Sequence, residues 1–176
     1  MNIKGLTRLA QALVTRIVVQ QNERAVLYRD GRAERWLHPG GYRFLSAPVE
    51  TRVERYDLNE GYARATPELE ALVPESEAER AIIPAQHAGV VSIDGVPVAW
   101  LSAGRVLLWR QRALVTLTLV DLNAPTLAIS EDMIELAPPD SLMTLLLAPH
   151  ERALLTLDGQ ASAWLESGRH VLWLRG

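Results

Sequence analysis

The chain has 176 residues, of which 48% are hydrophobic and 22% are charged, and its net charge is −3. This composition supports a folded core and excludes a basic field that would attract nucleic acid. Cysteine is absent, which excludes disulfides, cysteine nucleophiles and thiolate metal sites.

The first segment, 1–15, is predicted to be an N-terminal extension with Ile3, Leu6, Leu9 and Leu13 at near-helical spacing. An interfacial helix, a helix packed on the first unit and a frayed tail all fit this pattern. The segment lacks the apolar run and cleavage site of a signal peptide, and no window of the chain is apolar enough for a spanning helix. We expect a cytoplasmic chain without a transmembrane span, and peripheral membrane contact stays open.

One phrase occurs in three copies along the chain. Asp-Gly pairs begin at Asp30, Asp94 and Asp158, and both differences, 94 − 30 and 158 − 94, are 64. The same interval also relates Gly31, Gly95 and Gly159, then Trp36, Trp100 and Trp164, then Leu37, Leu101 and Leu165, then Gly40, Gly104 and Gly168. Leu45 maps by the same step onto Trp109 and Trp173. The sequence therefore predicts three tandem units with a period of 64 residues.

The first unit, 16–60, is predicted to be an antiparallel β-meander. Its apolar and β-branched runs predict strands at 16–20, 25–28, 33–37, 42–45 and 51–58. Asp30-Gly31 fits a two-residue type I′ hairpin turn, which requires positive φ at both central residues. The second unit, 81–123, repeats this order, so we expect a mainly β fold with at most short helices.

Two linkers connect the units. The acidic linker 61–80 predicts a short helix that starts at Thr66-Pro67 and ends at Pro74, with Leu69, Leu72 and Val73 on one face. The linker 124–144 predicts a strand, a turn and a strand.

The third unit, 145–176, is incomplete. The counterpart of Asp57 and Asp121 would be residue 185, beyond Gly176. Either the native protein ends on a partial unit or the chain is a fragment, and we favour the fragment. A sheet of about 60 residues is only marginally stable alone, so we expect the units to pack on one another.

Two stretches carry a resemblance to a known family. They are "ERAVLYRDGRAERWLHPGGYRFL" with "VERYDL", and "IIPAQHAGVVSIDGVPVAWLSAGRVLLW" with "VTLTLVDLNAPTLAISEDMIEL". Their order of strands, Asp-Gly hairpin, glycine turn and Asp-Leu strand end resembles the N-terminal module of slipins, the bacterial stomatin-like proteins of the SPFH or band 7 group. The resemblance implies a non-enzymatic, self-associating scaffold near a membrane.

No catalytic, metal or cofactor site is predicted. The four histidines have no metal-binding spacing and are interpreted as solvated turn residues: His38, His87, His150 and His170. One Asp per turn provides too few oxygen ligands for calcium, so the Asp-Gly aspartates and the recurring glycines are interpreted as turn residues. Ser130, Glu131 and Asp132 lack the oriented base that a nucleophile needs.

The recurring tryptophans are interpreted as core anchors or, if they point outward, as interface residues. The residues concerned are Trp36, Trp100, Trp109, Trp164 and Trp173. Arg105, Arg110 and Arg112 are interpreted as a solvated strand face, with a partner or anionic-lipid patch as the alternative.

The function expected from the sequence is a scaffold of slipin type that associates with itself through β edges and packing between units. The alternative is a monomeric adaptor that binds a peptide or protein at a sheet edge or in a groove between units. Both hypotheses expect a protein partner and no enzyme activity. The sequence names neither the partner nor the size of the assembly.

Overall fold

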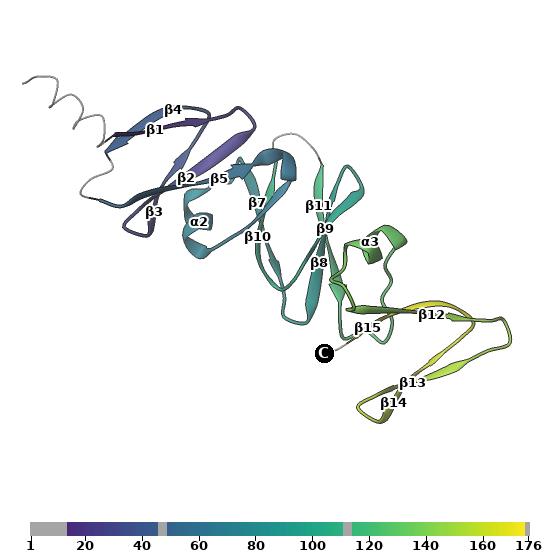
Figure 1. Ribbon diagram of the computed structural model, residues 1–176. Helices are drawn as coiled ribbons and strands as arrows, with labels where there is room; N and C mark the ends of the chain where they lie inside the picture. Colours follow the sequence, from purple (N-terminus) through teal and green to yellow (C-terminus); the bar gives the residue numbers. More distant parts are fainter. Residues whose placement is uncertain (1–13, 46–48, 111–113, 175–176) are drawn as a thin grey trace, which may run out of the picture. The chain divides into compact units, whose positions relative to one another are not determined.

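The computed structural model describes residues 14–45, 49–110 and 114–174 (Figure 1). Antiparallel strands dominate this part of the chain, and its helices are short, which confirms the prediction of a mainly β fold. Most of the predicted N-terminal extension lies outside the described residues. No described helix is long and apolar enough to span a membrane.

The elements follow one another in three similar series. The first series is β1 (Val14–Val19), β2 (Glu23–Arg29), β3 (Arg32–Leu37), β4 (Gly40–Leu45), β5 (Thr51–Asp57), the 3-10 helix η1 (Leu58–Glu60), β6 (Tyr62–Arg64) and α2 (Pro67–Leu72). The second is β7 (Ala78–Ile83), β8 (His87–Ile93), β9 (Val96–Leu101), β10 (Gly104–Trp109), β11 (Val115–Asp121) and α3 (Glu131–Leu136). The third is β12 (Leu142–Leu147), β13 (Ala153–Leu157), β14 (Gln160–Leu165) and β15 (Gly168–Trp173).

Equivalent elements of the three copies begin at the interval seen in the sequence. The strands β1, β7 and β12 start at Val14, Ala78 and Leu142, and both differences, 78 − 14 and 142 − 78, are 64. The pairing register also shifts by one residue at equivalent places, after Leu27, Val91 and Leu155. The copies therefore share their irregularities as well as their strands.

The strands within a copy do not pair as a meander, so that part of the prediction is wrong. The strand β2 lies between β3 and β5, whereas β1 pairs with β4, all antiparallel. The second copy has the equivalent sheet β9-β8-β11, and β10 lies between β6 and β7. Alternation of apolar and polar residues shows which face of a strand is buried but does not identify its neighbours, so it could not reveal this order.

The Asp-Gly pairs form tight turns between paired strands. Asp30 has φ 47° and Gly31 has φ 76°, and the pairs that begin at Asp94 and Asp158 have the same signs. Positive φ at both positions is what a type I′ hairpin requires. In the first two copies the aspartate also accepts a backbone hydrogen bond, from Glu50 N–H to Asp30 at 3.2 Å and from Leu114 N–H to Asp94 at 3.0 Å.

The described chain divides into two compact units that cut across the predicted domain ranges. Unit 1 contains the residues up to Arg80 and the segment that starts at Val106. Unit 2 contains 81–105 and the residues from Leu114 onward. Each compact unit thus combines the sheet of one copy with strand residues of the next copy, which the sequence ranges 16–60, 81–123 and 145–176 kept apart.

In unit 1 the sheet β3-β2-β5 is covered on both faces. Side chains from β1 and β4 pack on one face in a cluster of Val19, Ala25, Leu27, Leu37 and Phe44. The other face carries the cluster Val26, Trp36, Leu58, Ala63, Leu69, Val73, Ala78, Leu107 and Trp109. Because β2 contributes to both clusters, its central residues Ala25, Val26 and Leu27 are fully buried.

The helix predicted in the acidic linker is confirmed. Thr66 caps α2 by accepting a hydrogen bond from Leu69 N–H at 3.3 Å, and Pro67 occupies the first turn. Leu69 is buried in the second cluster, so the short helix closes one side of the unit 1 core.

A buried carboxylate joins this helix-containing linker to the sheet. Glu77 lies 2.7 Å from Arg24 Nε and accepts a 3.3 Å hydrogen bond from Trp36 Nε1. Its other oxygen lies 3.1 Å from His38 Nδ1. A buried charge is tolerated only when it is paired and hydrogen-bonded, and Glu77 meets both conditions.

In unit 2 the linker 124–144 forms α3, so the prediction of a strand, a turn and a strand is wrong. The helix occupies Glu131–Leu136, and Met133 and Ile134 pack against the cluster around Val90 and Val171. Isoleucine and leucine side chains suit a strand as well as a buried helix face. Six residues are too few to distinguish the 3.6-residue period of a helix from the two-residue period of a strand. The position of α3 is that of α2 one copy later.

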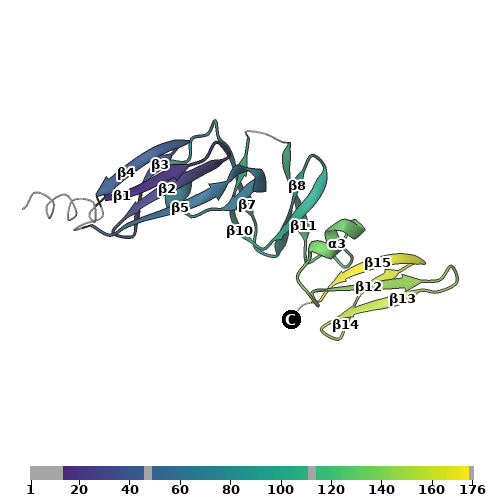
Figure 2. The same ribbon diagram turned by 45° about the horizontal axis from the view of Figure 1, so that its top comes forward.

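The third copy has a smaller sheet than the other two. Among the described residues, β13 pairs with β14 alone, and β12 pairs with β15 (Figure 2). The counterparts of β13 are β2 and β8, each of which has a strand on both sides. Within the described ranges, no strand pairs with the other edge of β13.

We predict that Gly89→Ala lowers the free energy of unfolding by about 1–3 kcal/mol, because the side chain overpacks a filled core. A Cβ at Gly89 would lie 2.5 Å from Ile83 Cδ1 and 2.8 Å from Leu117 Cδ1. Gly41→Ala is the matched control, since a Cβ there meets nothing within 4 Å. Urea unfolding followed by circular dichroism measures both, and equal midpoints for the two variants would contradict the packing described for β8.

Candidate interaction surface

One aromatic contact anchors the second cluster of unit 1. Trp36 of β3 and Trp109 of β10 have ring centroids 6.1 Å apart, and Tyr56 of β5 lies 6.0 Å from Trp36 and 6.2 Å from Trp109. Trp36 is 8% exposed and Trp109 is 3% exposed. Within the described residues the Trp109 indole N–H has no hydrogen-bond partner. The contact therefore stabilises the unit by burial and ring packing.

Unit 2 contains the equivalent contact one copy later. Trp100 of β9 and Trp173 of β15 stack with centroids 6.1 Å apart and ring planes 8° apart. Val90 lies opposite Trp100 in the register of β8 and β9, as Val26 lies opposite Trp36 in the first copy. In both units, then, a tryptophan from a strand of the next copy packs against a valine–tryptophan pair on the sheet of the copy before it.

The third copy presents the same pair uncovered. Leu154 of β13 lies opposite Trp164 of β14, at the positions of the earlier valine and tryptophan. Leu154 is 46% exposed and Trp164 is 69% exposed, whereas Val26 and Val90 are fully buried. We call Leu154, Trp164 and the open edge of β13 the tail face.

The first copy presents the other half of the contact, also uncovered. Leu45 of β4 maps onto Trp109 and Trp173 in the repeat and is 65% exposed. It lies opposite Val14 of β1, which is 39% exposed, and Val18 of the same strand is 45% exposed. We call Val14, Val18 and Leu45 the head face.

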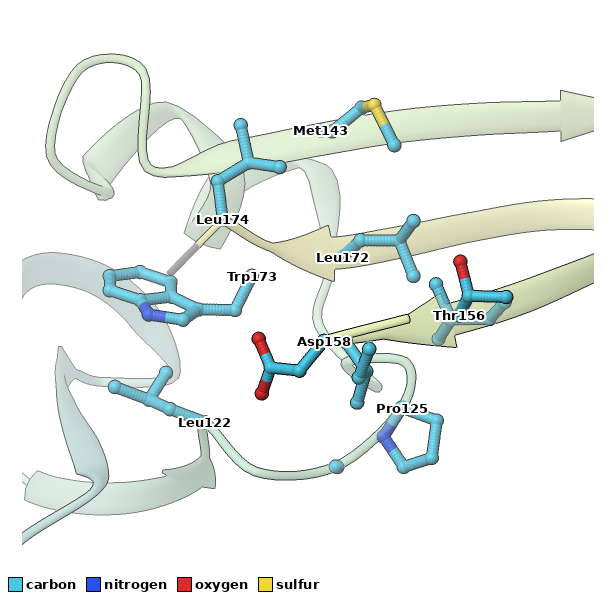
Figure 3. A pocket seen from close by; sticks show the side chains of 11 residues that line it. Leu122, Pro125, Met143, Thr156, Asp158, Leu172, Trp173 and Leu174 are labelled. Atoms are coloured by element: carbon cyan, nitrogen blue, oxygen red, sulfur yellow. The ribbon is translucent and has the colours of Figure 1, made fainter. Parts of the chain in front are cut away.

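A hollow of about 330 Å³ lies in unit 2 next to β13. Figure 3 shows side chains that line it, including Leu122, Met143, Leu172 and Trp173. The carboxylate of Asp158 lies close to these apolar side chains. Its lining comes from β12, β13, β15 and the segment after β11. A mostly apolar hollow of this size fits an inserted side chain.

A second, more polar hollow lies in unit 1, around Tyr28, Arg52, Glu54 and Tyr56. The Arg52 guanidinium stands 4.7 Å from the centre of the Tyr28 ring. Burial, followed by the charge of Glu54, raises the pKa of both Tyr28 and Tyr56 above the usual value. Both phenols, which are neutral at physiological pH in any case, therefore stay neutral and able to donate a hydrogen bond to higher pH than an exposed tyrosine.

The predicted histidines lie at separate places. His38 contacts Glu77, the His87 ring lies 3.3 Å from Ala85 O, and His170 Nε2 lies 2.7 Å from Glu166 O. His150 is exposed. In the described ranges no three His, Asp or Glu side chains gather in a way that could hold a metal ion.

The tryptophans differ in environment although they are equivalent in sequence. Trp36 and Trp109 are core residues, Trp100 and Trp173 are partly buried, and Trp164 is exposed. Among the predicted arginines, Arg110 lies 3.5 Å from Glu79, and Arg112 lies outside the described residues. The glycines Gly40, Gly104 and Gly168 all have positive φ, but they are the first residues of β4, β10 and β15, so their interpretation as turn residues is wrong.

Sequence reasoning missed Leu45 and Leu154 as surface residues. The repeat indicated both positions, because residues 64 apart are equivalent and can be written in one column of an alignment of the three copies. Leu45 falls in the column of Trp109, and Leu154 falls in the column of Val26 and Val90. Which columns touch each other was not visible in the sequence.

No protein-family model matches the chain, and it matches neither a curated protein nor a solved structure. The resemblance to slipins therefore rests on the motifs quoted above.

We predict that Trp109→Ala lowers the free energy of unfolding by about 3–5 kcal/mol, because it removes a buried aromatic side chain and leaves a cavity. Trp164→Ala should change the free energy of unfolding by less than about 0.5 kcal/mol, since little of this exposed ring is buried in the isolated chain. Thermal and urea unfolding at low protein concentration measure both. A comparable loss for Trp164→Ala would show that this ring supports the fold.

Proposed function

We propose that this protein is a non-enzymatic scaffold module that associates with itself through its open β edge and uncovered apolar faces. The observation that carries the proposal is Trp164, which is 69% exposed although its counterpart Trp36 is 8% exposed. A tryptophan on an open sheet is a common anchor of protein interfaces.

Two further features support association. The free edge of β13 offers backbone groups to an added strand. Leu154 adds apolar area beside Trp164. The resemblance to slipins favours the same function, because that family is built of self-associating scaffolds. A cytoplasmic location with contact to a membrane surface belongs to this proposal.

An adaptor that binds a peptide is the second candidate. The specific observation in its favour is the apolar hollow beside β13, because an extended peptide that adds to this edge could place a side chain there. In that case the chain is a monomer and gains stability when the peptide binds.

We predict that the molar mass of the 176-residue chain rises above 19.5 kDa with concentration. Light scattering during size-exclusion chromatography, over about a hundredfold range of concentration, measures this by mass action. High salt should not abolish the association, since its main contacts are apolar. A constant mass of one chain at every concentration would sink the scaffold proposal and leave the adaptor.

A further inference from the structure

This inference rests on the proposed function and names both the partner and the polarity of the assembly. We propose that the tail face of one copy of this chain binds the head face of a second copy, head to tail. The contact reproduces the one that each compact unit already contains.

The internal contacts provide the template. Trp36 receives Trp109 in unit 1, and Trp100 receives Trp173 in unit 2, both with centroids 6.1 Å apart. In each case the receiving residue and the inserted residue are 73 positions apart, since 109 − 36 and 173 − 100 are equal. The contact is thus made twice by the same columns of the repeat.

Among the described residues, each of the two sets of repeat-equivalent positions has one member outside these contacts. Trp164, which is equivalent to Trp36 and Trp100, is 69% exposed. Leu45, which is equivalent to Trp109 and Trp173, is 65% exposed. Each has an exposed apolar cross-strand neighbour, Leu154 opposite Trp164 and Val14 opposite Leu45. A second copy of the chain therefore carries the surface that the tail face would receive by analogy with the internal contacts.

One residue of the head face departs from the template. Arg43 of β4 occupies the position of Leu107 and Val171, which are 0% and 5% exposed in the internal contacts. An arginine keeps an apolar stem and a guanidinium that stacks on tryptophan, so it is compatible with burial beside Trp164. Its desolvation makes the contact between copies weaker than the internal contacts and hence reversible.

The polarity has a structural consequence. Head and tail are different surfaces, so the contact is heterologous, and an open assembly keeps a free head at one end and a free tail at the other. Such contacts build linear chains, or rings when the rotation closes, instead of closed dimers. Assembly should therefore continue past the dimer as the concentration rises.

Two complementary variants test this inference. Leu45→Glu places a charge in the head face, and Trp164→Glu places a charge in the tail face. Both substitutions are at exposed positions. Each variant alone should stay at 19.5 kDa by light scattering, and their equimolar mixture should form a dimer and nothing larger. Val96→Glu is the matched control, because Val96 is 62% exposed and belongs to neither face. Circular dichroism melts confirm that all three variants are folded.

The outcomes separate this inference from the proposed function. A monomeric parent chain overturns both. If the parent chain associates and the Trp164→Glu variant associates as well, the scaffold function stands and the head-to-tail contact is overturned. Loss of association in Trp164→Glu but not in Leu45→Glu means that the tail binds another surface, and folded single variants that stay monomeric when mixed also overturn the inference.

A gain of association provides the fifth prediction. Arg43→Leu restores the residue type of the internal contacts and should lower the concentration of half-association by about tenfold, because no charge is desolvated. Sedimentation velocity over a concentration series measures the shift. An unchanged or raised concentration of half-association would show that Arg43 does not lie in the contact, and the proposed register would fall.

Discussion

The structure depends on the burial of one copy's tryptophan against the sheet of the copy before it. Trp109 packs on Trp36, and Trp173 stacks on Trp100. The central strands β2 and β8 carry buried apolar residues on consecutive positions, so both faces of their sheets must be covered. In unit 1 the copy's own β1 and β4 supply one cover, and residues of the following copy supply the other.

This arrangement explains why a sequence with three copies forms compact units that do not coincide with them. A sheet of three short strands has too little core to be stable with one face in water. The covering strands come from the next copy, and the buried pair of Glu77 and Arg24 reinforces that connection in unit 1. Within the described residues, the corresponding pair of the third copy, Leu154 and Trp164, is exposed.

Much of the local structure could be predicted. The Asp-Gly turns and α2 follow from backbone chemistry, because positive φ favours Asp and Gly and because Thr66-Pro67 favours a helix start. The helix α3 could not be recognised from its own residues, since Met133 and Ile134 suit either period, although its equivalence to α2 was available. The meander was wrong because β1 and β4 leave the sheet of β2, and nothing local identifies a strand's partner.

The sequence by itself determined the interval of 64, the position of each turn and the residues that share a column, because these depend on local conformation and on repetition. Only the tertiary structure decided that β2 pairs with β5, that Trp36 meets Trp109, and that Trp164 and Leu45 are left uncovered. The reason is physical: identical residues acquire different burial according to which later strand covers them. That covering depends on contacts between residues far apart in the chain, which no local pattern encodes.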